Sequence, residues 1–251
     1  MKVLLTVSYV GTNFMGYQLQ KDDRTVSLCL NRACEEAFGF LCNVTGCSRT
    51  DRGVHATGFK ATIEPKFKSD RITVPVEKIP IALNLKLPND VSVLDASLVD
   101  DSFHPRYDVK KKEYVYKIHA SSTRNPFLDN LILEFGRTIS EESFKKMEEA
   151  AKLFVGKHDF SSFMSVGSKI EDCTRVVYES YLVRDGEYVE YHIVANGFLY
   201  NMVRIIVGTL LHVALGKISP DKIPEIINGK NRKLAGPTAK PCGLYLANVI
   251  Y

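Results

Sequence analysis

The sequence has none of the short motifs that mark a bound cofactor or metal. Its six cysteines form no C-x-x-C pair, its histidines form no H-E-x-x-H motif, and it has neither a glycine-rich dinucleotide fingerprint nor a P-loop. Four-residue gaps separate Cys29 from Cys34 and Cys42 from Cys47, but no histidine lies near them at the spacing of a zinc ligand. We therefore predict reduced thiols, no cofactor and no metal.

The sequence also has no long apolar run free of polar residues. The apolar segment 198–215 contains Asn201, Arg204 and His212, and an arginine in a bilayer span is energetically costly. Residues 1–9 alternate like a strand, and no small-residue signal-peptide cleavage site follows them. The sequence therefore predicts a buried helix over 198–215, no membrane span and a cytoplasmic protein.

The chain has little excess charge, because its net charge is only +4. The positive charge is nevertheless concentrated, since segments 106–124 and 217–240 each carry a net charge of +4 and the remainder carries −4. Such concentration is typical of a surface that binds a polyanion such as RNA, although two solvated faces would give the same pattern.

Hydrophobic periodicity and turn signals predict a mixed fold. Strands are expected over 2–9, 54–64, 91–98, 113–119, 176–184, 188–195 and 244–251, and helices over 25–38, 76–85, 140–154 and 198–215. Ser140 is the expected N-cap of the third helix. Because hairpin strands and crossover helices mix in both halves, we predict an α+β fold with a largely antiparallel central sheet flanked by helices. We predict two similar halves, 1–100 and 101–251.

The segment 48–58 contains the densest set of candidate catalytic groups. It places Asp51 between Arg49 and Arg52 on a glycine-containing turn just before a predicted strand. Nearby positive charge favours the ionised carboxylate, and an ionised carboxylate can act as a nucleophile towards a sugar. The alternative is a surface aspartate that pairs with its neighbours in an Asx turn.

Arg204 is the second candidate, because it lies inside the apolar helix predicted over 198–215. A guanidinium stays protonated, so a buried Arg204 would need an anionic partner, whereas a partly exposed one would extend to solvent. We hypothesise that Arg204 pairs with Asp51 across the junction of the two halves.

Two tyrosines form the third candidate site. Tyr114 and Tyr116 share one face of the strand predicted over 113–119 and follow the basic run 110–112. Aromatic faces beside basic residues suit a nucleobase that has left its stack. The alternative is a pair of core or cross-strand tyrosines.

Taken together, these residues resemble the tRNA pseudouridine synthase A family. Residues 49–56 match the family's R-T-D-x-G-V-H-A motif, and residues 202–208 match M-V-R-x-x-V-G. Further matches follow the family's order along nearly the whole chain, at residues 9–18, 82–91, 103–107, 112–116, 156–163 and 238–246.

The resemblance implies a pseudouridine synthase fold with an active-site cleft between two halves. It implies isomerisation of uridine to pseudouridine at positions 38, 39 and 40 of the tRNA anticodon stem-loop, by a cytoplasmic homodimer that uses neither cofactor nor metal. Asp51 would be the nucleophile, Arg204 its ion-pair partner and Tyr114 the residue that packs on the target base. Arg49 would help to hold the flipped nucleotide.

The same resemblance supplies candidate RNA contacts in the segment 103–107 and in the loop 167–171. The candidate substrate-binding residues are Arg49, His55, Phe103, His104, Arg106, Tyr107, Lys110 and Tyr114.

The sequence departs from the family pattern at Val10, Tyr17, Ser27, Ser48 and Arg52, where the family usually has other residues. None of these positions is a candidate catalytic residue, but they are compatible with a paralogue that modifies other tRNA positions. A non-catalytic RNA-binding module is the alternative from another functional class. A carboxylate-dependent nucleoside or glycoside hydrolase is less favoured, because no second carboxylate is evident near Asp51.

Overall fold

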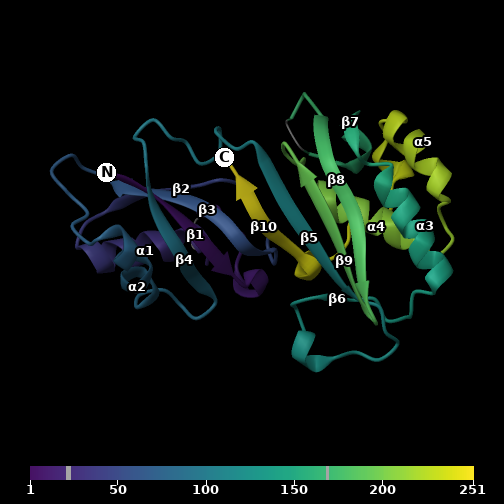
Figure 1. The fold of residues 1–251 in the computed structure, drawn as a ribbon, viewed down its shortest axis with the longest axis horizontal. Helices are drawn as coiled ribbons and strands as arrows, with labels where there is room; N and C mark the ends of the chain where they lie inside the picture. The colour runs from purple at the N-terminus through teal and green to yellow at the C-terminus, as the bar shows by residue number, and fades with distance from the viewer. Residues whose placement is uncertain (21–23, 168–169) are drawn as a thin grey trace. The chain divides into compact units, whose positions relative to one another are not determined.

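The computed structural model describes residues 1–20, 24–167 and 170–251 (Figure 1). These residues form two compact units. The first unit comprises Met1–Lys110 together with Tyr245–Tyr251, and the second unit comprises Lys111–Leu244. Each unit combines a sheet with helices.

The sheet of the first unit has the strand order β4-β1-β3-β10. The strand β2 pairs with the C-terminal end of β3. Its strands are β1 (Lys2–Tyr9), β2 (Cys42–Gly46), β3 (His55–Pro65), β4 (Val91–Val99) and β10 (Leu244–Ile250). The strand β10 runs parallel to β3, with Tyr245 opposite His55. This pairing is why Tyr245–Tyr251 belong to the first unit, whereas the sequence predicts them in the second half, with a boundary at residue 100.

The described residues of the first unit also form two α-helices, α1 (Val26–Phe38) and α2 (Ile79–Asn84). α1 begins after Thr25, whose hydroxyl accepts a hydrogen bond from the Leu28 N–H at 3.3 Å, and it ends at Gly39 with φ of 79°. Such caps satisfy backbone groups that a helix leaves unpaired at its ends. Alternate side chains of β1 are buried, as the predicted period of two requires.

The sheet of the second unit has the strand order β5-β9-β8-β7, and β6 pairs with β5. Its strands are β5 (Lys111–His119), β6 (Leu133–Glu134), β7 (Gly156–Asp159), β8 (Thr174–Asp185) and β9 (Tyr188–Ala195). The predicted hairpin forms between β8 and β9, with Asp185 opposite Tyr188 and Gly186 at φ of 57°. A positive φ at this position suits the tight turn of a two-residue hairpin loop.

The helices of the second unit are α3 (Glu141–Lys152), α4 (Met202–Ala214) and α5 (Ile223–Asn228). In Figure 1 they lie together beside β8 and β7. Ser140 caps α3 as predicted, since its hydroxyl accepts a hydrogen bond from the Ser143 N–H at 3.1 Å. α4 starts at Met202 rather than at the predicted residue 198, because Asn201 has a left-handed backbone with φ of 60°.

Most neighbouring strands are antiparallel, and helices flank the sheet in each unit, which confirms the predicted α+β class. All six cysteines are free thiols. Among the described residues, no helix is long and apolar enough to cross a membrane, and no three or more acidic, cysteine or histidine side chains are grouped as metal ligands would be.

Candidate active site

Asp51 lies half-buried in the loop between β2 and β3. The loop is held at both sides of this residue. The Thr50 carbonyl accepts a hydrogen bond from the Tyr17 N–H at 3.3 Å, and the Thr50 hydroxyl lies 2.8 Å from the buried Tyr9 hydroxyl. The Asp51 carbonyl accepts a hydrogen bond from the Val54 N–H at 3.2 Å. These contacts fix the backbone from which the candidate nucleophile projects.

Two glycines of the segment 9–18 pack directly against this loop. A Cβ atom on Gly11 would lie 1.9 Å from the Val54 carbonyl oxygen, and a Cβ atom on Gly16 would lie 2.4 Å from the Thr50 carbonyl oxygen. Gly16 also has a φ of 92°, a backbone conformation that residues with a side chain rarely adopt. The glycines of this segment are therefore required for close contact between its backbone and the loop that carries Asp51.

His55 supports the same loop from β3. Its ring is fully buried, its Nδ1 accepts a hydrogen bond from the Gly11 N–H at 3.0 Å, and it stacks on Tyr245 at 4.6 Å. The structure therefore shows His55 supporting this loop, and its predicted substrate contact stays a prediction. Arg49 and Arg52, by contrast, are both exposed.

The candidate RNA contacts at residues 103–107 form a compact turn built on His104. The Nδ1 of His104 accepts hydrogen bonds from the Arg106 N–H at 3.2 Å and the Tyr107 N–H at 3.3 Å. Tyr107 stacks on the His104 ring at 4.2 Å and is 77% exposed. The turn therefore presents an ordered aromatic ring to solvent beside the half-buried Arg106.

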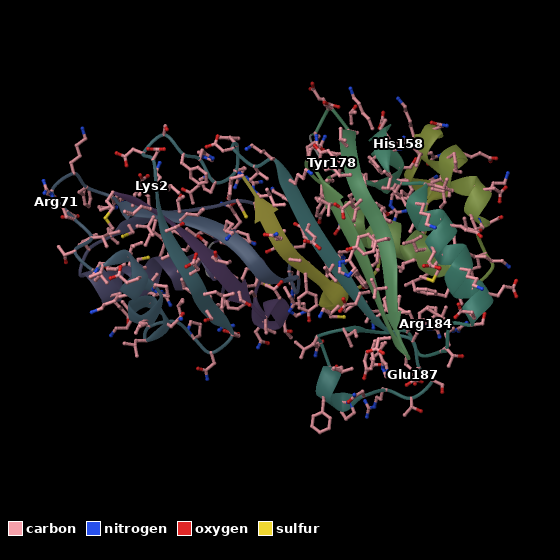
Figure 2. All side chains as sticks on the ribbon, in the orientation of Figure 1. Lys2, Arg71, His158, Tyr178, Arg184 and Glu187 are labelled. Atoms are coloured by element: carbon pink, nitrogen blue, oxygen red, sulfur yellow. The ribbon has the colours of Figure 1, made fainter. Side chains whose placement is uncertain are left out.

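Residues from both ends of the chain hold this turn in place. Lys2, labelled in Figure 2, donates hydrogen bonds to the carbonyls of Asp101 at 2.6 Å and Phe103 at 3.2 Å. The ring of Phe103 contacts the Tyr251 ring edge-on at 4.8 Å. The exposed Lys110 donates its backbone N–H to β10, at the Ile250 carbonyl. The loop 167–171 includes positions 168 and 169, which lie outside the described residues.

In the second unit, Tyr114 and Tyr116 are both buried on β5. Tyr114 contacts the Phe198 ring edge-on at 4.9 Å. The Tyr116 hydroxyl donates a hydrogen bond to the Lys240 carbonyl at 2.6 Å, and burial raises the pKa of this phenol, which keeps it neutral. Tyr116 therefore has a structural contact, and Tyr114, whose ring lies against Phe198, stays the tyrosine predicted to pack on a base.

Arg204 lies in the first turn of α4 and is half-buried. Its Nε donates a hydrogen bond to the Ala239 carbonyl at 2.8 Å, and its Nη1 donates to the Asn201 Oδ1 at 2.6 Å. Within the second unit the guanidinium is therefore oriented by two neutral acceptors. These two contacts involve two of the five N–H donors of the guanidinium.

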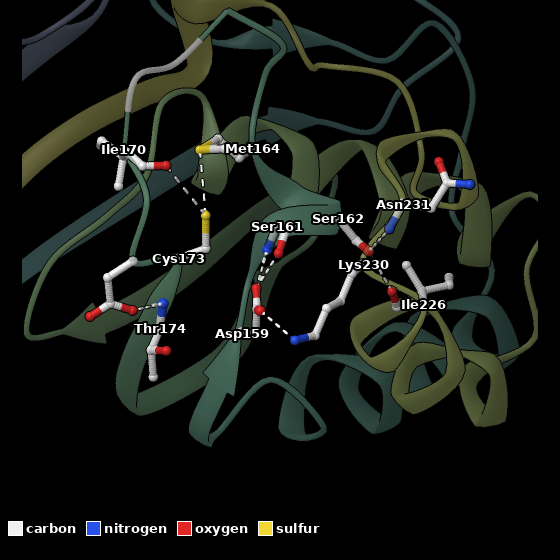
Figure 3. A network of polar contacts seen from close by, with 11 residues as sticks. Asp159, Ser161, Ser162, Met164, Ile170, Cys173, Thr174, Ile226, Lys230 and Asn231 are labelled. Carbon is white, nitrogen blue, oxygen red and sulfur yellow. Dashed lines mark hydrogen bonds and ion pairs between the residues drawn. The ribbon is translucent and has the colours of Figure 1, made fainter.

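The motif at residues 156–163 anchors part of the second basic segment (Figure 3). The Asp159 carboxylate accepts a hydrogen bond from Lys230 Nζ at 2.9 Å. The Ser162 hydroxyl donates to the Ile226 carbonyl at 2.6 Å and accepts from the Asn231 N–H at 2.8 Å. One lysine of this basic segment is therefore engaged in an ion pair within the second unit, and the motif acts here as a structural anchor.

Several residues that shape the candidate site have no sequence signal for that role. Lys2 and Tyr251 contact residues of a turn that are 99 and 146 positions away in the sequence, and Ala239 contributes only backbone groups. Asn201 lies inside the helix predicted over 198–215, so the sequence gives no indication that it precedes the helix or contacts Arg204.

Comparison with known proteins gives consistent matches along the chain. A family model for tRNA pseudouridine synthase matches residues 150–251. The tRNA pseudouridine synthase A of Caldicellulosiruptor saccharolyticus is 42% identical over 249 residues, which cover 99% of each chain. The protein of the same name from Thermoanaerobacter sp. strain X514 is 43% identical over the same length and coverage. A chain in the crystal structure of a Cbf5-Nop10-Gar1 complex aligns with this protein at 12% identity and a TM-score of 0.34. The alignment covers 84% of this protein and 53% of the other chain, and the similarity is too weak to support an argument about the fold.

Proposed function

Because this chain belongs to the tRNA pseudouridine synthase A family and is therefore an isomerase that acts on tRNA uridine, we propose that it modifies positions 38, 39 and 40 of the anticodon stem-loop. We propose Asp51 as the nucleophile. The observation that supports this role is the rigid loop around a half-buried carboxylate, held by Thr50 and by the close approach of Gly11. Preorganisation of this kind is what a reacting group requires.

The reaction breaks the C1′–N1 bond of uridine, turns the uracil and forms a C1′–C5 bond, while the C5 hydrogen leaves as a proton and N1 takes up a proton. The target base must first leave its stack, at a cost of a few kcal/mol. Asp51 can act at C1′, at C6 or on a ribose proton, and each route needs an ionised carboxylate. In this proposal Arg204 is the ion-pair partner of Asp51, Tyr114 packs on the base, and Arg49 helps to hold the flipped nucleotide.

RNA binding in this proposal uses the exposed part of the first unit. The turn built on His104, with Phe103, Arg106 and Tyr107, and the exposed Lys110 are the proposed contacts to the tRNA. A stacked aromatic ring beside a cation is suited to an unpaired base, and lysine is suited to phosphate. A tRNA substrate and six free thiols fit a cytoplasmic protein.

We also propose a homodimer. Its support is the exposed apolar surface of the β8–β9 hairpin, where Tyr181, Val183 and Tyr188 are 40–48% exposed. Apolar side chains that are clustered on one surface often mark a protein–protein contact. Light scattering after gel filtration should give about twice 28.2 kDa, and Val183→Asp should shift the protein towards the monomer.

Tritium release from tRNA that is labelled at uridine C5 tests the reaction, and mapping of pseudouridine in the product tests the positions. We expect release by the wild type and loss of release in Asp51→Ala. The matched control is Asp95→Ala, which removes an exposed carboxylate from β4 of the same unit and should keep full activity. Release by Asp51→Ala would exclude the nucleophile, modification elsewhere would indicate a paralogue, and tRNA binding without release would indicate a non-catalytic module.

A further inference from the structure

Asn201 has an unusual backbone next to a candidate catalytic group. Its φ of 60° lies in the left-handed region, and among the described non-glycine residues only Asn130 and Lys230 share a positive φ. This conformation is unfavourable for a residue with a side chain, and it persists only where the surrounding contacts enforce it. Asn201 directly precedes α4, so the turn occurs three residues before Arg204.

The side chain of Asn201 does not cap the helix. Asparagine at an N-cap normally accepts a hydrogen bond from the N–H two or three residues later, which contributes about 1 kcal/mol. The described contacts of α4 include no side-chain cap from Asn201. Its Oδ1 accepts instead from Arg204 Nη1 at 2.6 Å, and its Nδ2 donates to the Ser165 hydroxyl at 2.8 Å. The stabilisation that a cap would give is therefore replaced by contacts that orient the guanidinium.

A second nitrogen of the guanidinium contacts the segment that precedes β10. The Ala239 carbonyl accepts from Arg204 Nε at 2.8 Å, and the Ala239 N–H donates to the Arg204 carbonyl at 3.0 Å. This segment packs tightly on α4, since a Cβ atom on Gly208 would lie 1.7 Å from the Pro237 carbonyl oxygen. Two acceptors on different atoms of a planar group fix the plane as well as the position of that group.

We infer that Asn201 is a positioning residue for the isomerisation: its left-handed backbone turns its amide onto Arg204 and, together with the Ala239 carbonyl, sets the plane of the guanidinium. This inference rests on the proposed function, in which Arg204 holds the nucleophile. A purely structural alternative exists, because the Ser165 contact also ties the loop after β7 to α4.

The test compares Asn201→Gly with the wild type in steady-state assays of tritium release, which give kcat and KM for tRNA. Glycine accepts a positive φ, so this variant deletes the side chain and leaves the backbone unstrained. We expect kcat to fall about 10- to 100-fold, the range expected when a catalytic group is misplaced, with an unchanged KM for tRNA. The matched control is Asn130→Gly, which makes the same change at a φ of 59° on an exposed residue and should keep wild-type kcat.

A double-mutant cycle separates positioning from structural support. Arg204→Lys keeps the positive charge but lacks the planar fork that Asn201 and Ala239 hold together. If Asn201 acts through Arg204, Asn201→Gly should change kcat less than about threefold in the Arg204→Lys background, because coupled residues are non-additive. The same loss in both backgrounds, a rise in KM alone, or wild-type kcat in Asn201→Gly would each overturn the inference. An inactive wild type would instead refute the proposed function, and the inference with it.

Discussion

The two units hold their candidate residues by different means. In the first unit, the loop of Asp51 is held mainly by its backbone, whose carbonyls at Thr50 and Val54 lie against Gly16 and Gly11. In the second unit, Arg204 is oriented by hydrogen bonds from its own side chain. A backbone contact excludes every residue larger than glycine, whereas a side-chain contact can be replaced by a similar acceptor. The first unit should therefore be the less tolerant of substitution around its site.

Gly11→Ala should give the largest effect. The new methyl group would lie 1.9 Å from the Val54 carbonyl oxygen, so the backbone next to Asp51 would have to move. Overpacking of this kind destabilises a fold by about 3 kcal/mol when the neighbour is backbone. We expect a loss of that size in urea unfolding, together with loss of tritium release.

Two alanine variants in the second unit calibrate this result. Gly208→Ala should be equally destabilising, because its methyl group would lie 1.7 Å from the Pro237 carbonyl oxygen. Gly208 is therefore a position in the second unit where a backbone contact also requires glycine. Gly197→Ala is the control, since its methyl group would meet only the Arg175 side chain at 3.5 Å. If Gly11→Ala unfolds at the same urea concentration as Gly197→Ala, the loop of Asp51 does not depend on that contact.

His55→Leu should have the next largest effect. The substitution leaves the Gly11 N–H without its acceptor in a buried position, which costs about 2 kcal/mol, and it removes the stacking on Tyr245. His55→Asn is the matched variant, because its Oδ1 lies near the place of Nδ1 and can accept the same hydrogen bond. Urea unfolding should rank wild type above His55→Asn, and His55→Asn above His55→Leu. Equal losses in the two variants would show that the hydrogen bond contributes nothing.

Two buried tyrosine hydroxyls allow a direct comparison between the units. Tyr9→Phe removes the contact to Thr50 in the first unit, and Tyr116→Phe removes the contact to the Lys240 carbonyl in the second. Each should lower the free energy of unfolding by about 1 kcal/mol. Only Tyr9→Phe acts on the residue next to Asp51, so it should also lower kcat. A reduced kcat in Tyr116→Phe with an unchanged kcat in Tyr9→Phe would contradict the prediction that the reaction depends more on the contact in the first unit.

The sequence correctly predicts the elements whose structure depends on a local pattern of residues. The alternation in β1, the Ser140 cap of α3 and the glycine turn between β8 and β9 all depend on residues close in the chain. The short strands β2, β6 and β7 and the helix α5 were missed, because a segment of two to six residues depends on partners far away. The pairing of β10 with β3 is non-local for the same reason.

The candidate site divides in the same way. Asp51, Arg204 and Tyr114 are recognised from residue type and motif, and their catalytic roles stay predictions. The groups that orient Arg204 were not recognised, because a backbone carbonyl such as that of Ala239 has no residue-type signature. Asn201 occupies the N-cap position of α4, and only the structure shows that its backbone is left-handed and that its amide contacts Arg204.

Asp159→Asn should give the smallest effect and should depend on pH. Burial raises the pKa of the Asp159 carboxyl, but hydrogen bonds from Ser161 and Lys230 outweigh it, and the net pKa lies below the ordinary value of 3.8. A carboxyl with a lowered folded-state pKa stabilises the fold above its unfolded pKa, and this contribution is lost as the pH falls through the folded pKa. The variant should therefore be less stable than the wild type by less than about 1 kcal/mol at pH 7.

The difference between Asp159→Asn and the wild type should shrink as the pH falls below 3.8, because the wild-type carboxyl then becomes protonated and loses its charge-assisted contact with Lys230. Urea unfolding of both proteins at pH 7 and at pH 3 measures this change, and the other carboxyl groups cancel because both proteins share them. A difference that stays constant over this range would mean that the ionic contact in Figure 3 contributes no stability. This part of the second unit would then be held by neutral hydrogen bonds such as those of Ser162. The two units would then differ in whether backbone or side-chain groups make the contacts, and not in the charge of those groups.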